Sequence, residues 1–378
     1  MNSNMPKDPG FDKTLSVLKE GYEFIMNRKD DLNSNIFETR ILGEKAICLT
    51  GSERAELFYD NTRFRRSDAA PARVEKTLFG QGGIQGLDGE VHKNRKAMFM
   101  SLMDPQAMDE IETVTQKYWH EFFADKDSKD TVELYEAAKV VFLKVACDWV
   151  GISLQDEDIE ARAQQISDLY ESPAALGFQH WKGRKSRADA EDWIQGIGDG
   201  KIEADKDRAL YQFSMHTDLD GELLSPEVVT VELLNLIRPI NAISVWVAMI
   251  GLALHEHPDE ATKLKDADDQ QLEWFIQEVR RFYPFFPFAV ARADLDFEWN
   301  GYEFKEGTLT LLDLYGTNRH PDDWVKPEVF MPQRFQGWQQ TPFNFIPQGG
   351  GSYDFGHRCA GEFITIVIMR DHTRLPSQ

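Results

Sequence analysis

The sequence has little cysteine and far fewer positive than negative charges. Its three cysteines among 378 residues cannot build a disulfide framework, which excludes the small disulfide-stapled folds of secreted proteins and indicates a reducing compartment. The 42 Lys and Arg residues are outnumbered by 64 Asp and Glu residues. Because the formal charge of −22 repels polyanions, non-specific nucleic-acid binding is excluded as a function.

Long apolar segments and leader peptides are also missing from the sequence pattern. The longest apolar run, Ile243–Leu254, has 12 residues and contains Ser244, so it is too short to span a bilayer. The N-terminus, MNSNMPKDPG, has no charged start followed by an apolar core and predicts no signal peptide. We therefore expect a cytoplasmic protein with no membrane span.

The pattern that is present is mainly helical. A hydrophobic content of 42% supports a large core. Segments with apolar residues at helical spacing are 11–28, 52–59, 104–124, 131–150, 184–203, 225–257 and 271–283. Strand patterns are restricted to 36–42, 46–50, 295–299, 302–304 and 308–312, and polar connections are expected at 125–130, 204–222 and 263–270. The sequence predicts a mainly α protein with a small β portion.

One cysteine lies in an unusual setting. Cys359 follows a glycine-rich loop in the stretch QGGGSYDFGHRCAGE (348–362) and precedes AGEFITIVIM, which predicts a buried helix. The positive end of a helix, together with His357 and Arg358, favours the thiolate form. A thiolate in such a loop is suited to be an axial ligand of an iron porphyrin. The alternative is a small buried thiol that only fills space.

Two further motifs precede this loop in a fixed order. Glu278 and Arg281 lie three residues apart on one helix face, where they can form an ion pair. Pro332-Gln333-Arg334-Phe335 then places a second arginine in an extended segment. An isolated pair of this kind is usually a solvated surface pair. In the order Glu-x-x-Arg, Pro-x-Arg-Phe and glycine-rich cysteine loop, the set is distinctive.

This order resembles the cytochrome P450 superfamily over about 11–369. The resemblance implies a single P450 domain over 1–378 with haem b as cofactor, Cys359 as the iron ligand, and Glu278, Arg281 and Arg334 as a charge triad before the haem loop. Ser352 replaces the usual aromatic residue, and His357 replaces the usual arginine. The chain is expected to be truncated at its C-terminus. Residues 370–378 (RDHTRLPSQ) form an atypical tail, so the end of the last helix and the closing β unit are expected to be missing.

The central helix departs from most members of the superfamily. It reads ELLNLIRPINAIS (232–244), with Arg238 and Pro239 where an acid–alcohol pair is usual. An arginine in an apolar helix is costly unless an anion meets it, and a proline inside a helix kinks it. A buried carboxylate such as Glu232 is one such anion.

A fatty-acid carboxylate is the second candidate anion for Arg238. Arg-Pro at this position resembles the fatty-acid peroxygenase branch of the superfamily. The segments that also agree with that branch are LKEGYEFI, GGIQGLDGEVHKNRK, HWKGRK, EVRRFYPFFPF, LDLYGTN and IPQGGG.

The resemblance implies hydrogen-peroxide-dependent hydroxylation of long-chain fatty acids at the α or β carbon without a redox partner. The substrate carboxylate, held by Arg238, would act as general base and acid on the peroxide. Gln85 stands where decarboxylating members carry histidine, which favours hydroxylation, although Gln85 can also be an ordinary loop cap. The alternatives are a reductase-dependent monooxygenase, a fatty acid decarboxylase, and a truncated inactive haem-binding protein.

The remaining site residues are carried over by resemblance. Those expected to reach the haem propionates are Arg66, His92, Lys96 and His357. Those expected to line the substrate channel are Phe79, Phe285 and Phe288, and Ala242 is expected to leave space above the haem. Without the resemblance, the cations would be surface charges and the aromatic residues ordinary core. Cys48 and Cys147 are expected to be buried structural thiols.

Overall fold

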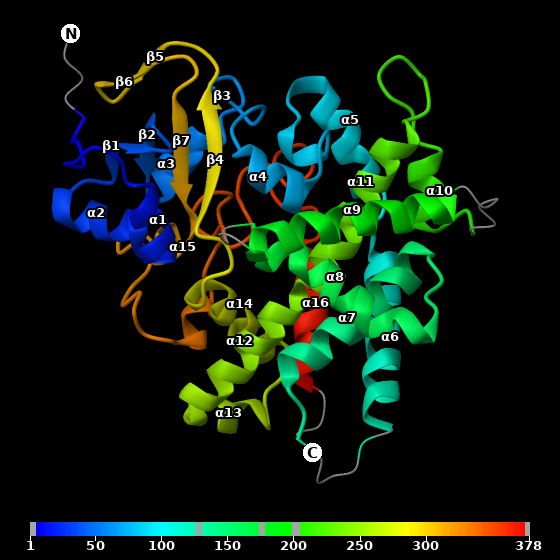
Figure 1. The fold of residues 1–378 in the computed structure, drawn as a ribbon. Coiled ribbons are helices and arrows are strands. Elements are labelled where there is room, and N and C mark those ends of the chain that lie inside the picture. The colour runs from blue at the N-terminus through cyan, green and yellow to red at the C-terminus, as the bar shows by residue number, and fades with distance from the viewer. Residues whose placement is uncertain (1–4, 125, 127–130, 174–177, 199–204, 375–378) are drawn as a thin grey trace. The chain divides into compact units, whose positions relative to one another are not determined.

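A computed structural model describes residues 5–124, 126, 131–173, 178–198 and 205–374. The chain forms two compact units that interleave in the sequence. The first contains 1–71, 85–89 and 277–359, and the second contains 72–84, 90–276 and 360–378. Helices dominate and strands are a minor part, which confirms the mainly α fold class (Figure 1).

The first unit is built on a mixed sheet. Its strands are β1 (Ile36–Ile41), β2 (Glu44–Leu49), β3 (Phe64–Arg65), β4 (Phe288–Ala293) and β7 (Leu309–Asp313), in the order β1-β2-β7-β4-β3. β1 and β2, which match the predicted strands 36–42 and 46–50, form an antiparallel hairpin. β2 runs parallel to β7 so that Cys48 lies beside Leu311. β5 (Phe297–Trp299) and β6 (Tyr302–Phe304) form a separate hairpin whose two aromatic pairs face each other. Cys48 is fully buried, as predicted.

Short helices surround this sheet. They are α1 (Thr14–Glu20), η1 (Gly21–Glu23), α2 (Phe24–Leu32), α3 (Ser52–Phe58), α15 (Leu314–Thr317) and η5 (Pro332–Phe335). Phe24 and Ile25 pack with Phe37 and Ile41, while Phe58 packs with Phe64. The apolar faces of the helices thus close the two sides of the sheet.

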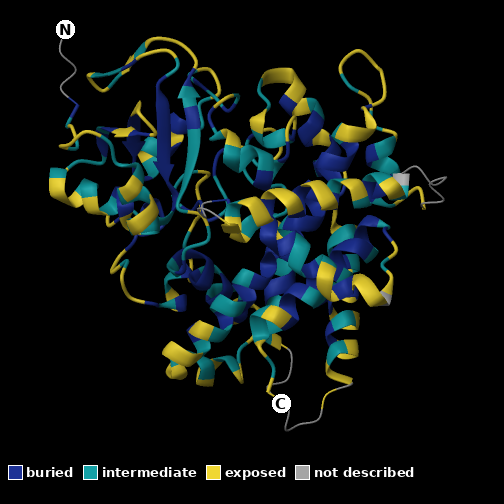
Figure 2. Ribbon diagram, in the orientation of Figure 1, coloured by how far each residue is buried: buried dark blue, intermediate teal, exposed yellow. Residues whose placement is uncertain are grey.

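The second unit is a helical body. Its elements are α4 (Ala72–Val74), η2 (Glu75–Phe79), α5 (Gly89–Met100), α6 (Pro105–Ala124), α7 (Leu134–Val150), η4 (Asp156–Asp158), α8 (Ile159–Glu171), α9 (Phe178–Gly198), α10 (Ala209–Ser214), α11 (Pro226–Asn241), α12 (Ile243–Glu256), α13 (Pro258–Leu264) and α16 (Glu362–Arg374). η3 (Ile84–Gly86) and α14 (Asp269–Phe282) cross from one unit into the other. α11 packs against α7, α8, α9 and α10, and Figure 2 shows the dark blue of buried residues concentrated there.

The predicted long central helix is interrupted. α11 begins with Pro226 behind the Ser225 cap, ends at Asn241 and is separated from α12 by Ala242. Pro239 has no N–H to donate to Asn235 O, four residues earlier, so α11 lacks one helical hydrogen bond near its end. Pro226–Glu256 is long and apolar enough to cross a bilayer, but 67% of its most apolar window is buried inside the protein. This stretch is therefore a core helix pair.

Several elements differ from the sequence prediction. The predicted helix over 11–28 is divided at Gly21, whose φ of 56° ends α1. α8, α10, α13, β3 and β4 were not predicted; α10, α13 and β3 are short, whereas α8 carries an apolar period that the sequence prediction missed. The predicted helix 184–203 begins earlier, at Phe178. Residues 125, 127–130, 199–204 and 375–378 of predicted segments lie outside the described residues.

The first residues of the predicted atypical tail continue the last helix. α16 extends to Arg374, and Gln116 Nε2 of α6 donates to Asp371 Oδ1 at 2.7 Å. Arg370 pairs with Glu112 of α6 at 3.4 Å. Residues 370–374 are therefore part of the helical packing, while the predicted loss of the helix end and β unit stays a prediction.

Candidate active site

Cys359 lies at the end of a loop whose conformation depends on glycine. Gly349 and Gly351 have φ values of 89° and 81°, which side chains disfavour. A Cβ on Gly350 would lie 2.6 Å from both Ile346 Cγ2 and Pro342 O, so no larger residue fits there. The backbone N–H of Cys359 donates to Gln348 O at 3.2 Å, which closes the loop. Cys359 is partly exposed and lies three residues before α16.

Gln348 also connects this loop to helix α14. Arg280 Nη2 donates to Gln348 Oε1 at 2.9 Å, and Gln348 Nε2 lies 3.9 Å from Cys359 Sγ. An amide donor near sulfur stabilises negative charge on it. Sequence reasoning missed both Arg280 and Gln348, although Gln348 is the first residue of the motif that carries the cysteine.

The predicted charge triad is present and buried. Arg281 Nε and Nη2 donate to Glu278 Oε2 and Oε1 at 2.7 and 2.8 Å, and Arg334 Nε lies 3.1 Å from Glu278 Oε2. Both Glu278 and Arg281 are 0% exposed. The remaining guanidinium N–H groups of the two arginines donate to backbone carbonyls of the segment 318–329. The triad therefore fixes the chain that precedes the haem loop.

Two predicted propionate-binding residues meet at a carboxylate that was not predicted. Asp88 accepts the backbone N–H groups of Arg66 and Ser67, both at 2.8 Å, and its Oδ1 lies 3.8 Å from His357 Nε2. The Arg66 guanidinium stacks on Phe58, with 4.3 Å to the ring centre. Burial lowers the pKa of Arg66 to about 10, so it stays charged at neutral pH.

The first unit also carries three other predicted site residues. Gln85 lies on η3, and its Oε1 is buried with no hydrogen-bond partner among the described residues. Phe285 stacks edge-on with Phe286 at 5.0 Å, and its carbonyl accepts from Tyr22 Oη at 3.1 Å. Phe288 begins β4, where it is half-buried. Phe288 therefore belongs to a strand that sequence analysis did not predict.

In the second unit, Arg238 is 6% exposed within the apolar helix α11. Its guanidinium lies over the Phe79 ring, 5.9 Å from the ring centre. Pro239 follows it inside the helix, and Ala242, 5% exposed, caps the helix end one turn later. The structure thus groups Arg238, Phe79 and Ala242 within one unit.

The buried carboxylate Glu232 is engaged by another arginine. Arg95 Nη1 of α5 donates to Glu232 Oε1 at 2.7 Å, and Asn235 Nδ2 donates to Glu232 Oε2 at 2.9 Å. Asn235 Oδ1 in turn accepts from Arg238 Nη2 at 3.3 Å. Burial raises the pKa of Glu232, which the Asn235 and Arg95 bonds partly offset. Arg238 is thus joined to Glu232 through Asn235, and Arg95 is the arginine paired with that carboxylate.

Within the first unit, the side chains present fit an iron porphyrin with propionate groups. Arg66 Nη1 in the first unit is buried with no hydrogen-bond partner among the described residues. His92 and Lys96, one turn apart on α5 in the second unit, are 3% and 2% exposed. The buried guanidinium of Arg66 needs an anion nearby. Cys359, in its glycine-built loop, would supply a sulfur ligand.

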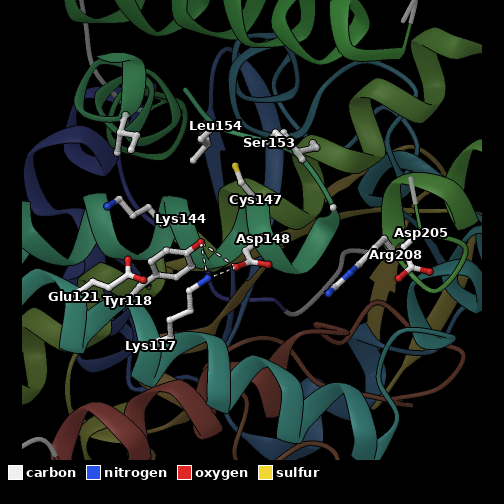
Figure 3. Close-up of a pocket in the computed structure, with 13 residues that line it drawn as sticks. Lys117, Tyr118, Glu121, Lys144, Cys147, Asp148, Ser153, Leu154, Asp205 and Arg208 are labelled. Carbon is white, nitrogen blue, oxygen red and sulfur yellow. Dashed lines mark hydrogen bonds and ion pairs between the residues drawn. The ribbon is translucent and has the colours of Figure 1, made fainter. Parts of the chain in front are cut away.

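A surface cleft of about 620 Å³ in the second unit contains none of these residues (Figure 3). In its wall, Lys117 Nζ and Tyr118 Oη donate to Asp148 Oδ2 at 3.1 and 2.9 Å. Cys147 contributes to its wall, and burial raises the pKa of that thiol well above its usual range. Cys147 is thus the predicted structural thiol, and the cleft is not the candidate site.

Comparisons with known proteins agree with this class of site. The family model for cytochrome P450 matches residues 267–370. Cytochrome P450EX alpha (CYP152N1), solved with myristic acid, is 47% identical with a TM-score of 0.95, covering 100% of this chain and 92% of that one. P450SP alpha (CYP152B1) with (R)-ibuprophen is 40% identical with a TM-score of 0.94, covering 97% and 91%. A variant of OleT with arachidonic acid is 34% identical with a TM-score of 0.93, covering 98% and 90%.

A more distant relative is beta-amyrin 28-monooxygenase of Vitis vinifera. It is 22% identical over 403 residues, covering 96% of this chain and 82% of the relative. Fold, cysteine loop and charge triad define a haem-thiolate oxidoreductase. The chain belongs to the cytochrome P450 family, in its CYP152 group of fatty-acid peroxygenases. The cofactor of this family is haem iron.

Proposed function

We propose that this chain hydroxylates long-chain fatty acids at the α or β carbon with hydrogen peroxide as the oxidant, using haem b and no reductase. The observation that carries the proposal is the buried Arg238 on an apolar helix beside Phe79. A guanidinium in such surroundings binds a carboxylate by charge-assisted, bidentate hydrogen bonds. The hydrocarbon chain of a fatty acid is apolar and therefore suits the apolar helix around Arg238.

Further support comes from the solved structures of P450SP alpha. They include variants substituted at an arginine, at an alanine four residues later and at a phenylalanine 47 residues after the arginine. Arg238, Ala242 and Phe285 are the same residue types at the same spacing. This agreement favours the three residues as members of the site.

Haem bound through Cys359 would supply the oxidising chemistry, which cleaves the peroxide and removes hydrogen from carbon. Cys359 would hold the iron, while Arg66, His92, Lys96 and His357 would hold the propionates.

The proton transfers need an acid–base group, and α11 does not offer a free one. Its two acids are Glu227, at the exposed first turn, and Glu232, already bonded to Arg95 and Asn235. A substrate carboxylate held at Arg238 would fill this role by taking a proton from the peroxide and returning it to the leaving oxygen. The same anchoring keeps the α and β carbons at a fixed distance from the carboxylate and hence in the reacting position.

Gln85 bears on the choice of product. It has no titratable group near neutral pH, so it holds a substrate by hydrogen bonds without donating a proton to it. Its buried Oε1 is available to an O–H or N–H donor. We therefore propose hydroxylation over decarboxylation to a terminal alkene.

The test compares two substitutions at one position. Arg238→Ala should lower kcat/KM for myristic acid with peroxide by about 10²–10³-fold, and Arg238→Lys should recover part of it as a point charge. Methyl myristate, which has no charge, should not be turned over by the wild type. Full activity of Arg238→Ala, or turnover that needs a reductase and NADPH instead of peroxide, would contradict the proposal. A terminal alkene as the main product would indicate decarboxylation.

A further inference from the structure

The first turns of α9 present an unusual exposed surface. Phe178 and Trp181 are 83% and 69% exposed, and they lie three residues apart on the helix. Lys182, Arg184 and Lys185 beside them are also exposed. We call these five residues the α9 patch. In Figure 2 the ribbon of α9 carries yellow, exposed segments along its length.

The charge of this surface is opposite to that of the whole protein. Residues 178–188 contain no Asp or Glu, whereas the chain has a formal charge of −22. Lys182 pairs with the buried Asp168 of α8 at 2.8 Å, so Arg184 and Lys185 carry most of the uncompensated charge. Burial, and after it the positive charges of Arg73 and Arg184, lower the pKa of His180. The patch is therefore a local cationic area on an acidic molecule.

Packing of the opposite face of α9 fixes the patch outward. A Cβ on Gly183 would lie 1.8 Å from Ser172 Oγ and 3.1 Å from Thr77 Cγ2, so α9 touches α8 and η2 closely at this point. Ser186 and Arg187 are 8% and 3% exposed. Since the inner face is committed to α8 and η2, the aromatic side chains cannot turn inward without breaking this contact.

We propose that the α9 patch docks the protein reversibly on the surface of an anionic lipid bilayer. Trp and Phe favour the depth of the lipid headgroups, where their apolar rings leave water, and neighbouring Lys and Arg pair with lipid phosphates. Two exposed aromatic rings beside cations fit this boundary between lipid and water. The flat face of an acidic protein partner would pair with the cations but leave the rings in water. No spanning helix is required, and a cytoplasmic location is retained.

Docking would bring the protein to fatty acids dissolved in the bilayer, but docking does not depend on the proposed function. α9 packs on η2, which carries Phe79. Long-chain fatty acids partition into bilayers, so a protein at that surface meets them at high local concentration. The binding itself is defined by charge and apolar contact and is measurable without turnover.

The experiment is flotation of the purified haem-loaded protein with phosphatidylcholine vesicles, with and without a minor fraction of phosphatidylglycerol. Wild type should float with the anionic vesicles at low salt and be released at high salt, because each cation near the surface contributes about fivefold in affinity. Phe178→Ser/Trp181→Ser and Arg184→Glu/Lys185→Glu should each reduce binding at least tenfold. The matched controls Leu219→Ser and Lys263→Glu/Lys265→Glu change exposed residues of the same kinds elsewhere and should bind like wild type.

Each result distinguishes docking from simple surface charge. Absence of wild-type flotation, or equal loss in the patch variants and the controls, would overturn the proposal. So would binding of wild type to an acidic protein column with none to vesicles, which would assign the patch to a protein partner. Peroxide-driven turnover of myristic acid in vesicle-free solution should stay at the wild-type level in all four variants, so failure of docking and failure of the proposed function are separable.

Discussion

The cysteine loop of the first unit and the arginine helix of the second unit hold their functional side chains by different means. Around Cys359, backbone geometry dominates: two glycines at positive φ, a third with no room for a Cβ, and a backbone bond from Cys359 to Gln348. Around Arg238, side chains dominate, through the chain Arg95–Glu232–Asn235–Arg238. The loop thus depends on glycines that no other residue can replace. The position of Arg238 depends on a series of polar contacts, each of which can be changed separately.

This difference suggests what each region permits. A metal ligand must be placed precisely and changes little between substrates, so a backbone-built loop suits it. A substrate anchor must bind and release, and a side-chain network can be adjusted one contact at a time. We therefore expect substitutions in the loop to act as all-or-none changes, and substitutions along the network to act in graded steps.

The largest expected effect is that of Cys359→Ala. Loss of the thiolate should abolish the red-shifted ferrous–carbon monoxide band and lower peroxide-driven turnover by at least about 10³-fold. Cys48→Ala is the matched control, because burial raises the pKa of the Cys48 thiol and it lies in β2. Absorption spectra of the two variants provide the measurement. A retained red-shifted band in Cys359→Ala would show that another residue ligates the iron.

The charge triad offers the next largest effect, on stability. Glu278→Ala leaves the buried guanidinium groups of Arg281 and Arg334 without their carboxylate, and we expect the free energy of unfolding to fall by about 3–5 kcal/mol. Glu328→Ala removes an exposed carboxylate that pairs with Arg319 and should cost below about 1 kcal/mol. Denaturant titration of both variants checks this. Equal losses would mean that burial of the triad has no energetic consequence.

The sequence predicts the cysteine loop better than it predicts the side-chain network around Arg238. The cysteine loop and Glu278–Arg281 are contiguous or close in sequence, so their residue types and spacing indicate the arrangement directly. Asp88, Arg95 and Gln348 are ordinary polar residues whose partners lie 22, 137 and 68 residues away, and only folding pairs them. Arg238 itself was conspicuous because an arginine is rare in an apolar helix, but the identity of its neighbours required the structure.

Asp313 is a buried carboxylate that, unlike Glu278, bonds to no arginine among the described residues, and its effect on stability should depend on pH. Asp313 accepts Gly316 N–H at 2.7 Å and lies 3.4 Å from Thr50 Oγ1, and burial raises its pKa to about 7. Because the folded state holds this proton and the unfolded state releases it near pH 4, stability should fall as pH rises from about 4 to 7 and be level above that. Asp313→Asn keeps the shape and removes this slope. The difference in stability between wild type and variant should change by about 4 kcal/mol between pH 4 and pH 7, and a difference independent of pH would contradict it.

The smallest expected effect is at the link between Glu232 and Arg238. Asn235→Ala removes the contact that orients the Arg238 guanidinium but leaves the charge in place, so we expect about tenfold weaker binding of myristic acid, the effect of one hydrogen bond to a charged group. Asn241→Ala on the same helix is the control, because Asn241 donates to Lys139 O at 2.6 Å and its loss should lower stability without changing affinity. Spectral titration with myristic acid and thermal unfolding separate the two. If both variants bound the acid as wild type does, the network would serve only to pack α11, and Arg238 would hold its position through the helix alone.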